Sequence, residues 1–145
     1  MNPEIFFLIQ SRGKFLNAFT NDSLKSQATA VWSRLSDLTP LLLIIMIILG
    51  VGLGAYYYKP YNDLPGRHYK VYHWGIVGII ATCLTFGITL LIEYFGIKTN
   101  LHTGLTSLYL MTALSNAIYC AAFYLITSIV WCNFLPTNAY KFLKV

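Results

Sequence analysis

Three long apolar runs, separated by short polar stretches, dominate the pattern of residues along the chain. They cover residues 40–58, 71–97 and 103–135. A helix rises ~1.5 Å per residue, so about 20 apolar residues cross a hydrocarbon core of ~30 Å. Each run is long enough for one crossing, and the connections are too short to form domains. The pattern therefore predicts three transmembrane helices.

Proline marks both ends of the first run. Pro40 suits the first turn of a helix, where its missing N–H costs nothing, and Thr39 or Asp37 is placed to cap the free amides. At the other end Lys59 precedes Pro60, and the residue before a proline is disfavoured in the helical region. We therefore expect the first span to begin at Pro40 and to end before Lys59.

The third run is longer than one crossing requires. As one helix, residues 103–135 would reach ~50 Å, yet two spans of about 20 residues and a turn do not fit there. We expect one long helix that projects from the bilayer at one end, or one that bends near Ser115 and Asn116. Pro136 ends it in either case.

Residues 1–38 precede the spans and carry an amphipathic pattern. Two sets of apolar residues recur near helical spacing, one before and one after the capping cluster at residues 21–23: Ile5, Leu8, Phe15, Leu16 and Phe19, then Leu24, Ala28, Val31 and Leu35. Such a segment lies on the membrane surface or docks to a partner protein. We favour the membrane surface, because Phe, Lys and Arg are mixed in it.

The composition supports a lipid environment. Of 145 residues, 57% are hydrophobic and only 10% are charged, whereas soluble domains carry about 25% charged residues. The predicted fold class is an all-α integral membrane protein with three transmembrane helices preceded by amphipathic N-terminal helical segments. Its parts are residues 1–38, a three-helix membrane domain at 39–136 and a short basic tail at 137–145.

The net charge of +5 does not indicate nucleic-acid binding, because the basic residues stand singly between apolar runs. Basic residues beside apolar spans are typical of a membrane surface. Counting those within ~15–20 positions of a span places the first loop and the C-terminal tail in the cytoplasm. We expect a bacterial inner membrane or another plasma membrane.

Small residues recur at close helical spacing within the spans. They are Gly50 and Gly54 in the first span, Gly75, Gly78 and Thr82 in the second, and Ala113, Ala117 and Ala121 in the third. Helices in lipid pack closely where small residues let their backbones approach. These positions predict packing within the chain or between subunits. The alternative is that glycine and alanine are simply common in membrane helices.

A polar seam follows one face of the third span. It consists of Thr112, Asn116, Cys120, Tyr124 and Thr127. Polar groups that face lipid are costly, so the seam is expected to face protein or water. One interpretation is hydrogen bonding between helices, which we favour; the other is the lining of a pore.

Glu93 is the only acid inside an apolar span. A carboxylate deep in the membrane is a candidate proton or ion relay, whereas one near a helix end reaches the interface. Because Lys98 follows about one turn later, we expect Glu93 to be an interfacial acid paired there.

No pattern indicates a metal, a cofactor or a reaction. His68, His73 and His102 have no ligand spacing, and the three cysteines stand singly in apolar sequence. The sequence has no GxSxG or HExxH motif and no phosphate-binding glycine loop. We therefore expect neither enzymatic activity nor a cofactor.

These features favour a non-enzymatic, membrane-embedded subunit of a larger assembly, such as the inner-membrane anchor of an envelope-spanning or secretion machine. Three spans enclose little interior, and their small-residue faces exceed what one bundle needs, so we expect homo- or hetero-oligomeric membrane partners besides the lipid bilayer. The alternative is a homo-oligomeric channel or membrane-permeabilising effector lined by the seam. A small transporter is a weaker alternative, because no inverted repeats or broken helices appear.

Overall fold

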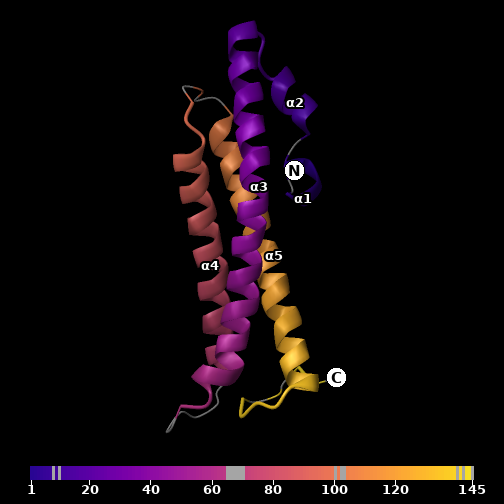
Figure 1. Ribbon diagram of the computed structural model, residues 1–145, viewed down its shortest axis with the longest axis vertical. Coiled ribbons are helices and arrows are strands. Elements are labelled where there is room, and N and C mark those ends of the chain that lie inside the picture. The colour runs from indigo at the N-terminus through magenta and orange to yellow at the C-terminus, as the bar shows by residue number, and fades with distance from the viewer. Residues whose placement is uncertain are drawn as a thin grey trace. The chain divides into compact units, whose positions relative to one another are not determined.

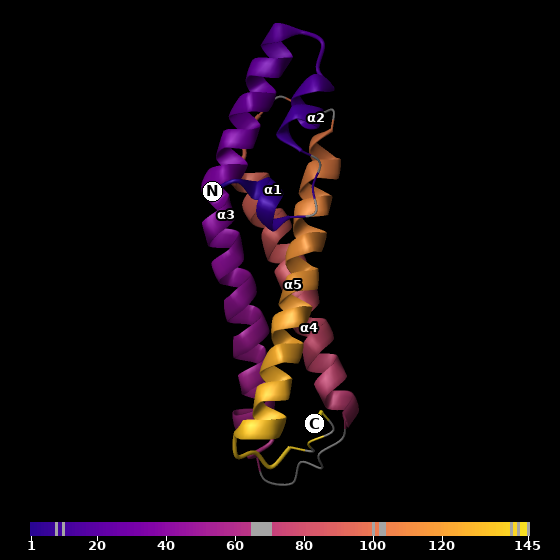
Figure 2. The same cartoon turned by 90° about the vertical axis from the view of Figure 1, so that its right-hand side faces the viewer.

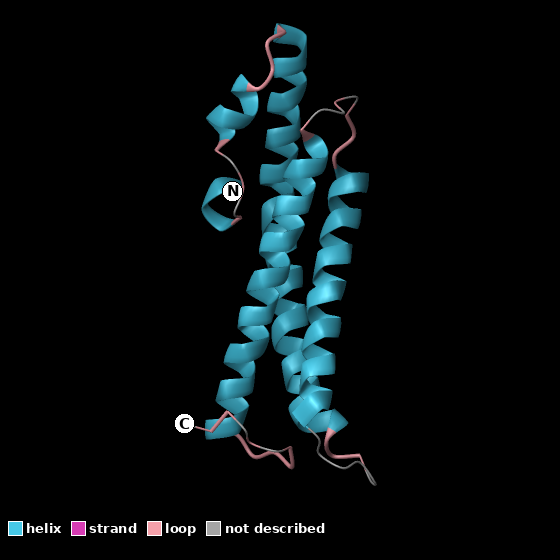
Figure 3. Cartoon of the chain, turned by 180° about the vertical axis from the view of Figure 1, so that it is seen from behind, coloured by secondary structure: helices cyan, strands magenta, loops and turns pink. Residues whose placement is uncertain are grey.

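The computed structural model describes residues 1–7, 9, 11–64, 71–99, 101, 104–139, 141 and 143–144. All regular structure within these residues is helical (Figure 3). The elements are α1 (Pro3–Phe6), α2 (Arg12–Asn17), α3 (Asp22–Tyr56), a π-helical turn (Tyr57–Tyr61), α4 (Val71–Gly96) and α5 (Leu105–Phe134). His68, His102 and the basic residues Arg67 and Lys70 of the first loop lie outside the described residues.

Three helical segments are long and apolar enough to cross a membrane. They are Asp22–Tyr61, which includes the π-helical turn, together with α4 and α5. The predicted second and third spans agree closely with α4 and α5, and α5 continues through Ser115 and Asn116 as one helix. The predicted fold class is confirmed: the chain is an all-helical membrane protein with three spanning helices after short N-terminal ones.

The helix that contains the first span begins well before its predicted start. Its first residue is Asp22, and the Lys25 N–H donates to the Asn21 carbonyl at 2.9 Å in the first turn. Pro40 lies inside this helix. The prediction that Pro40 opens the helix, with Thr39 or Asp37 as its cap, is therefore wrong.

A proline inside a helix leaves the carbonyl four residues earlier without its usual donor. For Pro40 this carbonyl belongs to Ser36, and the Met1 amino group donates to it over 3.3 Å. The freed carbonyl is thus satisfied from another part of the chain. Membrane helices tolerate proline where neighbouring groups restore the hydrogen bonding in this way.

The exposed face of α3 changes from polar to apolar at Pro40. Exposed side chains before this point include Lys25, Arg34 and Asp37, and those after it include Leu41, Ile44 and Ile48. Charged side chains favour water and aliphatic ones favour lipid, so this change agrees with the predicted start of the first span near Pro40.

The chain packs as two compact units, which are described separately. The first unit comprises Met1–Ile44 and Phe86–Asn116, and the second unit comprises Ile45–Thr85 and Ala117–Val145. Each of the three long helices contributes residues to both units.

In the first unit, α1 and α2 lie beside the early part of α3 (Figures 1 and 2). The Phe15 ring lies 5.5 Å from the Phe19 ring and 5.7 Å from the Trp32 ring, measured between centroids. The same apolar cluster includes Leu35 and, from the α4–α5 connection, Leu101. Most of the apolar residues predicted to face lipid or a partner are therefore packed within this unit. Ile5 and Leu24 are exposed, and Leu8 lies outside the described residues.

In the second unit, aromatic residues surround the end of α3. Pro60 lies in the π-helical turn that follows the helix, close to the predicted end of the first span. Tyr58 is buried and stacks on Trp131 of α5, with ring centroids 6.2 Å apart and ring planes 5° from parallel. Aromatic clusters of this kind are typical of the ends of membrane spans.

Candidate functional site

Asn116 of α5 connects three helices within the first unit. Its side-chain amide donates to the Leu42 carbonyl of α3 over 3.1 Å and to the Thr89 hydroxyl of α4 over 2.9 Å. The side chain is fully buried. Hydrogen bonds between membrane helices stabilise their association by ~0.6–2 kcal/mol. In this unit Asn116 faces protein and holds the helices together.

Glu93 lies one helical turn from Thr89 and is 0% exposed. Among the described residues neither of its carboxyl oxygens has a hydrogen-bond donor, and the side-chain oxygen of Asn116 also lacks one. From α5, the Thr112 hydroxyl and the Tyr109 phenol lie near the carboxyl group, but the Thr112 hydroxyl donates to the Leu108 carbonyl over 2.9 Å instead. Glu93, Asn116, Thr89 and Thr112 together form the polar layer of the first unit.

The expected pairing of Glu93 with Lys98 at the interface does not occur. Lys98 is exposed, whereas the Glu93 side chain is enclosed between α4 and the polar face of α5. Sequence spacing placed the two residues about one turn apart. However, Lys98 follows the end of α4 at Gly96, so it no longer continues the face that carries Glu93.

The polar seam of α5 is buried along its whole length. Its five members are between 0% and 9% exposed: Thr112, Asn116, Cys120, Tyr124 and Thr127. In the second unit the Tyr124 hydroxyl donates to the Trp74 carbonyl over 2.8 Å, and the Trp74 indole donates to Ser128 over 2.8 Å. The polar groups that could line a conduit are thus turned toward neighbouring helices.

Three glycines allow close packing against α5 in the second unit. A Cβ atom at Gly50 would lie 2.8 Å from the Cys120 carbonyl oxygen, and one at Gly54 would lie 2.9 Å from Thr127 Cγ2. A Cβ atom at Gly78 would lie 2.9 Å from the Tyr124 ring. No larger residue fits at these distances without displacing its neighbour.

The remaining small residues differ in how deeply they are buried. Ala113 and Ala117 are buried, and Ala121 is half-buried. A Cβ atom at Gly75 would have nothing within 4 Å among the described residues, so Gly75 takes no part in close packing with them.

Sequence reasoning missed the hydroxyl partners on α4. Thr82, Thr85, Thr89 and Glu93 follow one another at three- and four-residue spacing along this helix. Thr82 and Thr85 bond to carbonyls of their own helix, while Thr89 accepts the bond from Asn116. The spacing of these residues was the signal that α4 presents a polar face to α5.

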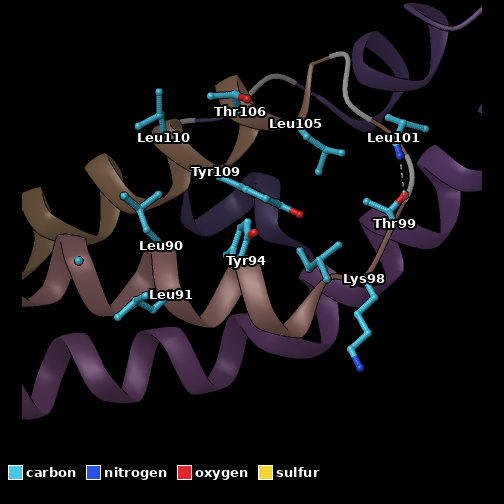
Figure 4. Close-up of a pocket in the computed structure, with 12 residues that line it drawn as sticks. Leu90, Leu91, Tyr94, Lys98, Thr99, Leu101, Leu105, Thr106, Tyr109 and Leu110 are labelled. Atoms are coloured by element: carbon cyan, nitrogen blue, oxygen red, sulfur yellow. Dashed lines mark hydrogen bonds between the residues drawn. The ribbon is translucent and has the colours of Figure 1, made fainter.

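A cavity of about 1020 Å³ lies in the first unit near the α4–α5 connection. Figure 4 shows the Tyr109 ring reaching from α5 toward the end of α4, while the Lys98 side chain extends away. The walls are mostly apolar and include Leu90, Leu91, Leu101, Leu105 and Leu110. Tyr109 belongs both to this wall and to the surroundings of Glu93.

Within the described part of the chain, no group of three or more His, Cys, Asp or Glu residues could hold a metal ion. The three cysteines are free thiols; Cys83 is exposed, and Cys120 and Cys132 are buried. Comparison with protein-family models, with curated proteins and with solved structures finds no match. Function is therefore inferred from the residues of this chain alone.

Proposed function

We propose that the protein is a non-enzymatic, membrane-embedded subunit of a larger membrane assembly, such as the inner-membrane anchor of an envelope-spanning or secretion machine. The observation that carries this proposal is the arrangement of the polar seam. Asn116 and Tyr124 both donate to backbone carbonyls of neighbouring helices within their own units. A pore lining would need such groups to face water, whereas a structural subunit uses them to hold its helices together.

The outer surface supports contact with lipid and with other subunits. The large exposed side chains of α4, from Val71 to Phe95, are apolar or aromatic. Gly75 and Gly87 have open space where a Cβ atom would stand. Small residues on such a surface permit the close approach of another membrane helix, so the proposal includes homo- or hetero-oligomeric membrane partners.

The proposal places the subunit in a bacterial inner membrane or another plasma membrane. The first loop and the tail are assigned to the cytoplasm because they carry more basic residues near the spans than the other side does. These residues are Lys59, Arg67, Lys70, Lys141 and Lys144, against Lys25, Arg34 and Lys98.

Conductance in planar bilayers separates a structural subunit from a channel. Neither the wild type nor Asn116→Asp is expected to conduct, because residue 116 faces protein. Asn17→Asp, which places the same charge at an exposed position at the end of α2, is the matched control. Wild-type conductance whose ion selectivity changes in Asn116→Asp but not in Asn17→Asp would contradict the proposal in favour of a homo-oligomeric channel.

Native mass measurement tests the assembly itself. Gentle extraction from the source membrane is expected to release a complex heavier than one chain, and the additional mass identifies its other subunits. A monomer under these conditions, together with no conductance in planar bilayers, would contradict the subunit proposal.

A further inference from the structure

The polar layer of the first unit holds an excess of hydrogen-bond acceptors. Both carboxyl oxygens of Glu93 and the side-chain oxygen of Asn116 are buried without a donor among the described residues. Buried polar atoms in folded proteins are almost always paired, and an unpaired one indicates a bound water, ion or functional role. Three such atoms from two neighbouring residues therefore require an explanation.

Two of the neighbouring groups, Asn116 and Thr112, donate their protons to other acceptors. Asn116 donates its amide protons to the Leu42 carbonyl and to Thr89. The Thr112 hydroxyl donates to the Leu108 carbonyl over 2.9 Å. With that proton committed, the Thr112 oxygen presents lone pairs to the Glu93 carboxyl beside it. Such oxygens repel one another unless a proton or a cation lies among them.

The charge of this layer selects the kind of cation. Glu93 is its only acid, and no Lys, Arg or His in the described part of the chain forms an ion pair with it. A buried charge in a membrane is stable only when it is paired or neutralised. One monovalent cation would balance one carboxylate, whereas a divalent ion would leave a net positive charge in apolar surroundings. Carboxylate, amide and hydroxyl oxygens suit hard cations rather than soft ones.

We propose that the polar layer is a binding site for one alkali cation, Na⁺ or K⁺. Glu93 supplies the charge, and Asn116, Thr112 and Thr89 supply neutral oxygens from the facing surfaces of α4 and α5. All four residues belong to the first unit. The site does not depend on whether the protein is an assembly subunit, because it is built from contacts within one chain.

Tyr109 connects this layer with the cavity near the α4–α5 connection. It lines the cavity (Figure 4), and its phenol interacts electrostatically with the Glu93 carboxyl. The phenol oxygen could therefore act as a further neutral ligand at the edge of the layer.

Thermal unfolding of the purified full chain in detergent tests the site. Melting temperatures are compared in sodium, potassium and choline chloride at equal ionic strength. Binding to the folded state alone predicts a rise of about 5 °C at ten times the dissociation constant of the favoured cation. Choline, which is too large to enter the polar layer, sets the baseline. Equal melting temperatures in all three salts would overturn the proposal and leave Glu93 as a carboxyl that holds only a proton.

Two substitutions test whether the cation that raises the melting temperature binds at Glu93. Glu93→Gln keeps the shape of the side chain and removes its charge, so the dependence on Na⁺ or K⁺ is expected to disappear. Asp63→Asn removes an acid from the second unit, outside the polar layer, and is expected to keep the dependence. A cation-dependent shift that survives in Glu93→Gln would show that the ion binds elsewhere, which also overturns the proposal.

Chemical modification of the wild type provides a test that does not depend on a variant folding. An apolar carbodiimide modifies neutral carboxyl groups within membranes, and peptide mass spectrometry reports the modification of Glu93. At ten times the dissociation constant, the bound cation is expected to slow this modification about tenfold relative to choline chloride. Equal rates in the three salts would contradict a cation at Glu93.

Discussion

Gly50 and Gly52 stand two positions apart on α3 but have different surroundings. The Cβ position of Gly50 lies 2.8 Å from the Cys120 carbonyl oxygen, and that of Gly52 has nothing within 4 Å. The neighbour of Gly50 is a backbone atom, which cannot move aside as a flexible side chain can. A larger side chain therefore has room at position 52 but not at position 50.

Substitution of these two glycines by alanine is expected to give effects of opposite sign. Gly50→Ala should lower the free energy of unfolding by about 1–3 kcal/mol, because it overpacks the contact with α5. Gly52→Ala should be neutral or raise it by up to about 1 kcal/mol, because alanine favours the helix. Reversible unfolding in mixed micelles measures both, and equal effects would contradict the close contact at Gly50.

Sequence patterns identified the small and polar residues but not their partners. Glycine spacing singled out Gly50, Gly54 and Gly78, yet it could not distinguish them from Gly75, which has no close neighbour in the part of the chain that the structure describes. The bond from Asn116 to Leu42 joins residues 74 positions apart, and such a contact depends on how the helices pack. A helical pattern defines a face, whereas the residue opposite that face is set by tertiary structure.

At the scale of elements, α3 combines a segment with exposed charged residues and an apolar segment in one helix. The membrane boundary near Pro40 stays a prediction, and the sequence did not locate the start of the helix. The sequence around a proline looks the same whether the proline lies in the first turn of a helix or in its interior. The difference depends on a distant donor, since the Met1 amino group supplies the hydrogen bond to Ser36.

Replacing Pro40 by alanine is expected to strengthen α3 at this point. The alanine would supply the missing N–H to the Ser36 carbonyl, and the steric conflict of the proline ring would be removed. Amide hydrogen exchange of the peptide around residues 36–44 should slow, whereas Leu41→Ala, at an exposed position, should leave the rate nearly unchanged. Faster exchange in Pro40→Ala would show that the helix needs the proline here.

The packing of α1 and α2 is tested at their central aromatic residue. Phe15→Ala should remove ~3–5 kcal/mol of packing free energy from the first unit, because Phe15 is buried against Phe19 and Trp32. Trypsin should then cleave faster at Arg12 and Lys14. Ile5→Ala is the matched control, since Ile5 is 75% exposed. Unchanged cleavage in Phe15→Ala would contradict this packing.

At the scale of the whole molecule, the central claim is that the chain crosses the membrane three times. Apolar periodicity and length were sufficient to predict the three spans, because a lipid environment requires long apolar helices with internally satisfied backbones. The polar layer around Glu93 was not predicted, since it arises only when α4 and α5 are placed side by side.

Accessibility of single cysteines from either side of sealed vesicles tests this claim most directly. In a variant whose native Cys83, Cys120 and Cys132 are replaced by alanine, new cysteines are placed at exposed positions outside the apolar spans: Asn21, Leu64, Lys98 and Asn138. A membrane-impermeant maleimide should label positions 21 and 98 from one side and positions 64 and 138 from the other. Labelling of positions 64 and 98 from the same side would contradict the three-span account.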